Sequence, residues 1–174
     1  MDKSYIDGLK DSQGVLGKEA IRAILPYGDA FLFVDAVTEL TTTNVVAHYS
    51  IPRSSELIDA HFKHIRLMPG VLIGEALAQA GIILLHYRSE FDEPTDIVAN
   101  SVNQMRFKSP ALPGDILEAH VSIKAINSLG ARLVGKSFVN QHEVLSATFD
   151  LTFVKRCQLI KHITEHSKRG VSLV

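Results

Sequence analysis

The amino-acid sequence predicts a protein of the α+β class, in which a curved antiparallel sheet wraps around one long buried helix. Residues 70–88 form a helix-length run that is apolar on nearly every side, and such a helix is buried in a core. Several strand-like segments follow this run and two precede it. Because the helix and the sheet both need their apolar faces covered, packing one on the other is the economical arrangement. We expect a single domain over residues 1–174, a length that can build its own core.

The expected elements follow one another in a consistent order. Residues 17–25 suit a short amphipathic helix that Pro26 ends. Residues 52–69 are expected to be irregular, with at most a short helical piece. Pro69 then stands where the helix of residues 70–88 begins, at a position where its missing N–H costs nothing. Segments rich in β-branched and aromatic residues between polar turns are expected to be strands: residues 31–40, 44–51, 97–109, 116–126, 132–140 and 144–154, with a hairpin tip at 141–143.

Alternation within residues 116–126 predicts that the sheet has one wet face. One phase carries Ile116, Glu118, His120, Ser122 and Lys124, and the other carries Leu117, Ala119, Val121, Ile123 and Ala125. This pattern is typical of an antiparallel sheet with one covered side. The tail over residues 156–174 is expected either to add a final helix through Leu159, Ile160 and Ile163 or to fray.

Composition and charge narrow the function classes. Hydrophobic residues make up 46% and charged residues 21% of the chain, as in ordinary soluble proteins. A net charge of -1 gives no global attraction to nucleic acid, although basic side chains can still form a local docking patch. The single cysteine, Cys157, suits a reducing cytoplasm. The N-terminus lacks the apolar segment of a secretory signal, and the longest apolar run, residues 71–85, is too short for a membrane span of about 20 residues.

One carboxylate, Glu75, stands in the middle of the apolar run of residues 70–88. Burial of a lone carboxylate is costly, and its pKa rises instead toward or past neutrality. A carboxylic acid that is neutral near pH 7 can donate a proton, as a general acid must. Alternatively, Glu75 is a structural residue paired with an Arg or Lys of a strand or of a partner subunit, because such networks also perturb carboxylates.

His61 precedes the helix on the irregular segment, where a side chain can be presented into a cleft. A neutral imidazole is the usual general base near neutral pH. The chain has 8 His, so a histidine in a loop carries little information by itself, and His64 competes for the same role.

The Met-Pro-Gly sequence at 68–70 opens the helix. The first N–H groups of a helix lack internal partners, and the positive end of the helix dipole lies behind them. Gly70 lets a substrate approach this backbone closely, so that a carbonyl is polarised as in an oxyanion hole. A base, an acid and such N–H donors together suit proton abstraction next to a carbonyl with loss of a β-substituent.

Three segments resemble the 3-hydroxyacyl-acyl carrier protein dehydratases of type II fatty acid synthesis. The first is His-Phe at 61–62 followed by MPGVLIGEALAQA at 68–80. The second is ILPYGDAFLFVD at 24–35, and the third is MRFKSPALPGD at 105–115. The resemblance covers about residues 16–155 and leaves a C-terminal extension over residues 156–174.

The resemblance implies a hotdog fold and a homodimer with shared active sites, which in this family often assembles further into a trimer of dimers. His61 and Glu75 are then the catalytic pair, contributed by different subunits. His61 takes a proton from C2 of a (3R)-hydroxyacyl thioester, and Glu75 protonates the departing hydroxyl or positions the water. The N–H of Gly70 holds the thioester carbonyl. The other residues expected to bind substrate are Phe62, Met68, Pro69 and Gln79.

The same resemblance implies a particular partner and no metal or redox cofactor. The acyl chain is carried on the phosphopantetheine of an acyl carrier protein and runs into an apolar tunnel. Surface Lys and Arg side chains line the way in for the phosphopantetheine arm.

Two departures from the family pattern stand out. The family's HFPGxP becomes HFKHIR, in which Lys63, His64 and Arg66 replace two prolines and a glycine. The length of this loop is kept, but its stiffness is not. The family's LPHRYPF becomes LPYGDAF, with Tyr27 and Gly28 in place of His-Arg. These changes concern the identity of the substrate and carrier docking more than the reaction.

Two alternatives remain open at this point. A hotdog thioesterase would use the acid to activate water against the thioester carbonyl. A non-catalytic homologue that binds acyl chains would keep the fold without turnover, and the altered HFKHIR loop is the feature that favours it. The order of residues favours dehydration, since the histidine precedes Met-Pro-Gly and the acid follows on the helix.

Overall fold

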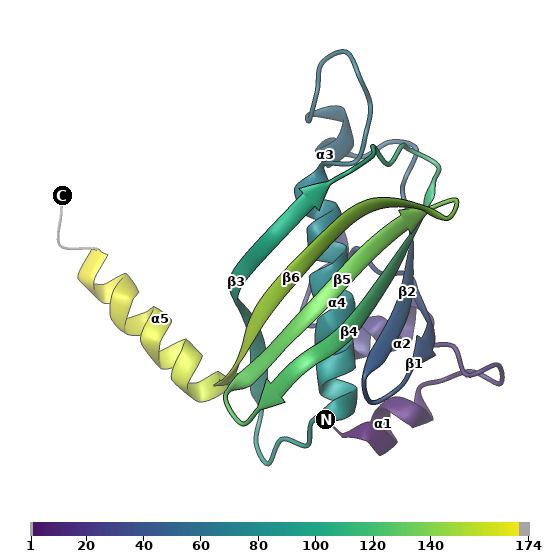
Figure 1. Cartoon of the computed structure of the whole chain (residues 1–174). Coiled ribbons are helices and arrows are strands. Elements are labelled where there is room, and N and C mark those ends of the chain that lie inside the picture. Colours follow the sequence, from purple (N-terminus) through teal and green to yellow (C-terminus); the bar gives the residue numbers. More distant parts are fainter. Residues whose placement is uncertain (1, 171–174) are drawn as a thin grey trace.

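The computed structural model of the chain describes residues 2–170, with the side chains of residues 166–170 excepted, and it contains one long helix packed against one antiparallel sheet (Figure 1). The helix, α4 (Gly70–Arg88), has the bounds predicted from the sequence, with Pro69 as its N-cap residue. Most of its side chains are buried, as expected for a helix that is apolar all round. Among the described residues, α4 alone has the length and hydropathy of a membrane span, and the core of the protein buries most of it.

Six strands form the sheet: β1 (Ala36–Leu40), β2 (Asn44–Ser50), β3 (Thr95–Phe107), β4 (Ile116–Asn127), β5 (Gly130–Val139) and β6 (His142–Lys155). Their order is β1-β2-β4-β5-β6-β3, and every neighbouring pair is antiparallel. The sheet curves around α4, which covers one of its faces (Figure 1). β1 and β3 are the two edges, so the long strand β3 has β6 on one side and an open edge on the other.

The predicted alternation along β4 is confirmed in its first part. Leu117, Ala119 and Val121 are buried, whereas Glu118 and His120 are partly exposed. The pattern ends at a bulge in the pairing of β4 with β5, beyond which both phases become accessible. The hairpin between β5 and β6 is tighter than predicted, because its tip consists of two residues, Asn140 and Gln141. Both have positive φ, 48° and 67°, the geometry that joins twisted strands with a two-residue turn.

The prediction of a strand over residues 31–40 is wrong for its first half. Residues Asp29–Phe31 form a short 3-10 helix, η1, and β1 begins only at Ala36. The reason is tertiary: the N–H of Phe33 donates to Oε1 of Gln79 on α4, 2.9 Å away, instead of to a neighbouring strand. The segment therefore crosses α4 as an extended strap and joins the sheet later.

Short helices complete the N-terminal half: α1 (Lys3–Gly8), α2 (Lys18–Ile24) and α3 (Glu56–Asp59). α2 is the predicted amphipathic helix, and Pro26 follows it. α3 is the short helical piece that was expected within residues 52–69, between Pro52 and Pro69. α1 was not expected from the polar N-terminus. It forms because the Asp2 side chain caps it by accepting from the Tyr5 N–H and because Ile6 is buried.

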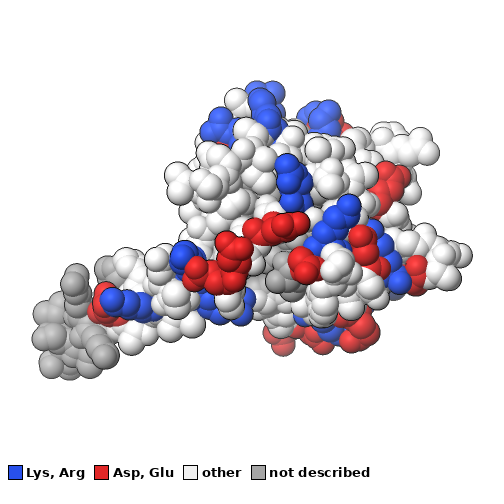
Figure 2. Space-filling model, turned by 90° about the horizontal axis from the view of Figure 1, so that it is seen from below, with Lys and Arg blue, Asp and Glu red and all other residues white. Residues whose placement is uncertain are grey.

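The tail forms a helix, α5 (Arg156–Gly170), over its described part, and residues 171–174 lie outside the described residues. α5 extends away from the rest of the chain in both views (Figures 1 and 2). Cys157, at its start, is exposed and free.

Candidate active site

Glu75 lies in the second turn of α4 and is half-buried. Burial raises the pKa of its carboxyl group, and a hydrogen bond from Gln79 partly opposes that rise. No Lys or Arg among the described residues forms an ion pair with Glu75, so none of them is the partner that a structural role would need. The arrangement favours a carboxyl group that holds its proton to higher pH than an exposed glutamate does.

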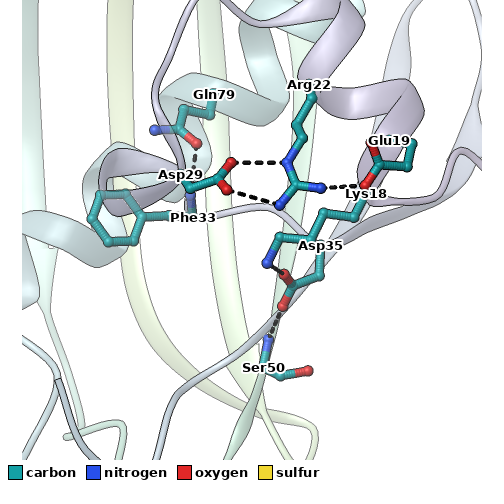
Figure 3. Close-up of polar contacts among 8 residues, drawn as sticks. All are labelled: Lys18, Glu19, Arg22, Asp29, Phe33, Asp35, Ser50 and Gln79. Atoms are coloured by element: carbon teal, nitrogen blue, oxygen red, sulfur yellow. Dashed lines mark hydrogen bonds and ion pairs between the residues drawn. The ribbon is translucent and has the colours of Figure 1, made fainter.

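Gln79 orients this carboxyl group. It is fully buried, and its amide Nε2 donates to Glu75 Oε1 at 3.0 Å and to the carbonyl oxygen of Phe31 at 2.8 Å. Its Oε1 accepts from the Phe33 N–H at 2.9 Å (Figure 3). Both ends of the amide are thus held by protein groups, whereas the sequence predicted contact with substrate. In this structure Gln79 acts on Glu75 and on the strap of residues 31–35, and a direct contact with substrate stays a prediction.

Polar contacts hold the strap on both sides of Gln79, as Figure 3 shows. On one side Arg22 of α2 binds Asp29 through Nε and Nη2, at 2.8 and 3.0 Å. On the other side Asp35 accepts from Lys18 Nζ and from the N–H of Ser50, each at 2.8 Å. The charged pairs are largely exposed, so they fix geometry more than they add stability. They keep the strap in place across α4.

The start of α4 offers free backbone donors. The Pro69 carbonyl accepts from the N–H groups of Leu72 and Ile73. No hydrogen bond among the described residues uses the N–H of Gly70 or Val71. A Cβ on Gly70 would lie 2.5 Å from Cδ1 of the Phe107 ring, so the backbone approaches β3 as closely as only glycine allows. These donors can accept a carbonyl oxygen at the positive end of the helix.

His61 and Phe62 lie on the exposed loop between α3 and α4, with their ring centroids 4.1 Å apart. No hydrogen bond or ion pair joins His61 to Glu75 within the chain. The single chain thus brings together Glu75, Gln79 and the start of α4, and it leaves His61 facing outward. His64 is exposed on the same loop.

The altered loop has its own tether. Arg66 Nη2 donates to Asp59 Oδ1 at 2.5 Å and to the carbonyl oxygen of Arg53 at 2.8 Å. Asp59 also accepts from the hydroxyl of Ser54 at 2.7 Å. These contacts tie the end of the loop to α3 and to the segment before it. The sequence showed the loss of the stiffening prolines but not this substitute.

An apolar cavity of about 200 Å³ adjoins the start of α4. Its lining includes Leu32, Phe33, Tyr49, Ile58, Met68 and Leu72. Met68, which was expected to bind substrate, is nearly fully buried in this wall, and Pro69 is buried beside it. The cavity suits an apolar chain rather than a charged ligand.

Tyr27, which the sequence marked only as a departure from the family pattern, lies near Glu75 in the structure. Burial, and then the charge of nearby Glu75, raise the pKa of its phenol. Its ring packs against that of Phe31, with centroids 5.9 Å apart. The only signal for Tyr27 in the sequence was an aromatic hydroxyl within residues 24–35, at a position where the family pattern differs.

Comparison with known proteins gives this arrangement a family. Residues 25–148 match the FabA-like domain. The chain belongs to this family. It is 34% identical over 153 residues to the 3-hydroxyacyl-[acyl-carrier-protein] dehydratase FabZ of Protochlamydia amoebophila, covering 87% of this chain and 98% of that protein. It is 43% identical over 111 residues to FabZ of Clostridium perfringens strain SM101, covering 63% of this chain and 79% of that protein. The FabA-like resemblance read from the sequence is confirmed.

Solved structures confirm the fold. The dehydratase heterocomplex ApeI:P from Xenorhabdus doucetiae superposes with a TM-score of 0.69 at 15% identity, over 82% of this chain and 96% of that chain. A hypothetical thioesterase with coenzyme A from Streptococcus pneumoniae TIGR4 gives a TM-score of 0.55 at 10% identity, over 68% and 84% of the two chains. At these identities the likeness concerns the fold alone. The predicted hotdog fold, one long helix wrapped by an antiparallel sheet, is correct.

Proposed function

We propose that this protein dehydrates (3R)-hydroxyacyl thioesters of acyl carrier protein to trans-2-enoyl thioesters in fatty acid or related lipid biosynthesis. The observation that carries the proposal is the half-buried Glu75 carboxyl, with its raised pKa, which Gln79 holds on the same helix whose first residue, Gly70, has a free N–H. The FabZ relatives, which are named for this reaction and align over most of their length, support it.

The proposed reaction needs a base, an acid and an oxyanion site. His61 removes a proton from C2, and the negative charge develops on the thioester carbonyl oxygen, which the Gly70 N–H receives. The C2–C3 double bond forms as the C3–O bond breaks. Glu75 gives its proton to the departing hydroxyl, which leaves as water. The steps transfer protons and break the C3–O bond without net oxidation or reduction, so they call for no redox cofactor, and the Gly70 N–H takes the place of a metal in polarising the carbonyl.

The base is supplied by a second copy of the chain. His61 is exposed on its own subunit, and no basic side chain among residues 2–165 pairs with Glu75. The open edge of β3 exposes Val98 and Val102, by 39% and 47%, and offers a surface for a homodimer. Such dimers can assemble further into a trimer of dimers.

The remaining partner is the acyl carrier protein, whose phosphopantetheine arm delivers the acyl chain to the cavity at the start of α4. A basic surface for nucleic acid is absent from the face seen in Figure 2, where Lys and Arg lie among Asp and Glu. The lone exposed thiol of Cys157 suits a reducing compartment, and we infer a cytoplasmic location.

An assay with purified protein tests the reaction. We expect it to interconvert 3-hydroxyacyl and trans-2-enoyl thioesters of acyl carrier protein, followed by mass spectrometry. His61→Ala and Glu75→Gln should each lower the rate by about 10²–10⁴-fold, the usual contribution of a general acid or base. His64→Ala, on the same loop, should retain activity. Hydrolysis of the thioester without the enoyl product would overturn the proposal in favour of a thioesterase, and binding without turnover in favour of a non-catalytic homologue.

Mixed dimers test the shared site. Co-expressed His61→Ala and Glu75→Gln chains form heterodimers in which one of the two sites has both an intact His61 and an intact Glu75. We expect activity to return in the mixture although each variant alone is inactive. A mixture that forms heterodimers and stays inactive would show that both groups act within one chain.

A further inference from the structure

The C-terminal helix α5 has a fixed base. The N–H of Arg156 donates to the carbonyl oxygen of Pro94 at 2.9 Å, and its guanidinium binds the carboxylate of Asp96, with Nη2 2.8 Å from Oδ1. Next to it, Lys155 pairs with Glu93 at 2.5 Å. These contacts tie the start of α5 to the start of the edge strand β3. The helix therefore leaves the body in a defined direction.

Beyond this base, the part of α5 whose side chains are described, up to residue 165, is largely exposed. Ile160 and Ile163 expose 57% and 55% of their surface, on one side of the helix. Gln158, Lys161 and Glu165 lie toward the other side, where polar residues belong. An isolated helix of this length is marginal in water, and a helix with an apolar face gains its stability by packing that face. A surface that covered Ile160 and Ile163 would therefore stabilise α5.

The direction of α5 indicates where that cover lies. In Figure 1 the helix leaves the bottom of β6 and passes beyond β3, the open edge of the sheet. Figure 2, turned by 90°, also shows it standing clear of the body. A second copy paired at the β3 edge would occupy the space alongside α5.

A second apolar surface on the same chain lacks cover. We call it the α4-start patch, and its exposed members are Leu57, Phe62, Ile65, Val71, Phe107 and Leu112. They belong to the segment from α3 to the first turn of α4 and to the end of β3 with the loop after it, and Phe107 of β3 lies against Gly70 at the start of α4. Val71, Ile65 and Phe107 expose 65%, 60% and 59% of their surface. Single exposed apolar residues are normal on a protein surface, whereas a group of them marks a site of interaction.

We propose that α5 of one subunit packs on the α4-start patch of a second copy, so that each subunit of a dimer clasps the other. Two-fold pairing of antiparallel β3 strands sets the start of one strand toward the end of the other. α5 is rooted at the start of β3 through Asp96, whereas Phe107 ends β3 and lies against Gly70 at the start of α4. The pairing thus brings the two uncovered surfaces of opposite subunits to one place. The inference rests on the homodimer proposed above.

Site-specific photo-crosslinking on the full chain tests the contact. A benzoylphenylalanine at position 163 is compared with one at position 158, on the opposite face of α5. Dimers mixed from ¹⁵N-labelled and unlabelled chains distinguish crosslinks between subunits from those within one. We expect mixed-isotope crosslinks from position 163 to residues 57–71 or 105–112, and few from position 158. Crosslinks within one chain only, or crosslinks that need added carrier protein or lipid vesicles, would overturn the inference.

Charge substitution supplies the second measurement. The pair Ile160→Glu and Ile163→Glu should weaken the dimer at least about tenfold by sedimentation, which corresponds to about 1.4 kcal/mol. Gln158→Glu, with the same added charge on the polar face, should leave it unchanged. A double variant that dimerises like the wild type would refute the clasp and leave the proposed dimer intact. A wild-type chain that is monomeric would instead refute the dimer itself.

Discussion

Gln79 donates a hydrogen bond of 3.0 Å to the Glu75 carboxyl group one helical turn earlier, and this bond connects the acid of the site to the strap that crosses α4. The same amide holds the strap through the carbonyl of Phe31 and the N–H of Phe33. The position of Glu75 and the path of residues 31–35 therefore depend on one buried side chain. A change at Gln79 should alter both at once.

Replacement of Gln79 by methionine, similar in length but without an amide, tests this coupling. The substitution leaves the Phe31 carbonyl and the Phe33 N–H without hydrogen-bond partners. Each unpaired group should lower the free energy of unfolding by about 1–3 kcal/mol. The bond from Gln79 lowers the pKa of Glu75, so its loss raises that pKa further. Because the proposed reaction uses Glu75 in its protonated form, the alkaline limb of the pH–rate profile should move to higher pH.

Chemical denaturation and the pH dependence of kcat/KM measure the two effects, with the exposed Gln158→Met as the control. A purely structural role for Gln79 would lower stability and leave the alkaline limb where it is. That outcome would contradict the assignment of Gln79 as a positioning residue.

Glu75→Gln should change how stability depends on pH. The folded-state pKa of Glu75 is raised above 4.5 by burial, so the folded state binds this proton more tightly than the unfolded chain. Its contribution to stability is fully present below pH 4.5 and is lost as the pH rises through the raised pKa. Glutamine cannot ionise, so the variant should lack this decline and become more stable than the wild type on the alkaline side. Denaturation midpoints across a pH series check this, and parallel curves for the two proteins would contradict it.

The sequence predicted α4 and its bounds because the determinants are local: a proline before the first turn and an apolar run without a break. The sequence also indicated Glu75 as a candidate functional residue from local information, since a carboxylate inside an apolar run is unusual. It failed for residues 31–35, whose composition favours a strand. Their path depends on Gln79, a residue far away in the sequence, and such a contact overrides local preference.

The same limit explains what was missed at the site. The position of Tyr27 beside Glu75 and the bond from Arg66 to Asp59 both depend on how separate segments meet in space. The sequence indicated that the loop loses stiffness where Lys63, His64 and Arg66 replace the prolines and the glycine. A proline restrains its own backbone, which the sequence reveals, whereas Arg66 restrains the loop through a partner residue, which the sequence does not. The position of His61 relative to Glu75 depends on how two subunits pair, so their meeting at one site stays a prediction about the dimer.

His86, near the end of α4, should make the protein sensitive to acid. Burial lowers the pKa of its ring from 6.5 to about 4, and its Nδ1 has no hydrogen-bond partner among the described residues. The unfolded chain therefore binds this proton more readily. The stability that depends on neutral His86 is present above pH 6.5 and is lost as the pH falls toward 4. At about 1.4 kcal/mol for each pKa unit, the loss amounts to about 3 kcal/mol.

His86→Phe keeps a ring of similar size and cannot take up a proton. We expect its unfolding free energy to fall less than that of the wild type between pH 6.5 and 4, by urea denaturation at a fixed protein concentration. His64→Phe, at an exposed position, should follow the wild-type curve. An equal acid sensitivity in all three proteins would show that His86 is not the group responsible.

Gly70→Ala should separate the packing of the α4 start from its role toward substrate. The added methyl would lie 2.5 Å from Cδ1 of Phe107, so this exposed ring must turn aside, and the loss in unfolding free energy should be about 1 kcal/mol or less. Phe107→Ala removes the obstacle, and the double variant should recover the stability lost by Gly70→Ala. The methyl still stands beside the free N–H of residue 70, where the proposed mechanism places the thioester carbonyl, so kcat/KM should stay low. A double-mutant cycle in stability and activity measures both. If removal of Phe107 restored activity together with stability, the Gly70 backbone would have no direct part in binding the carbonyl.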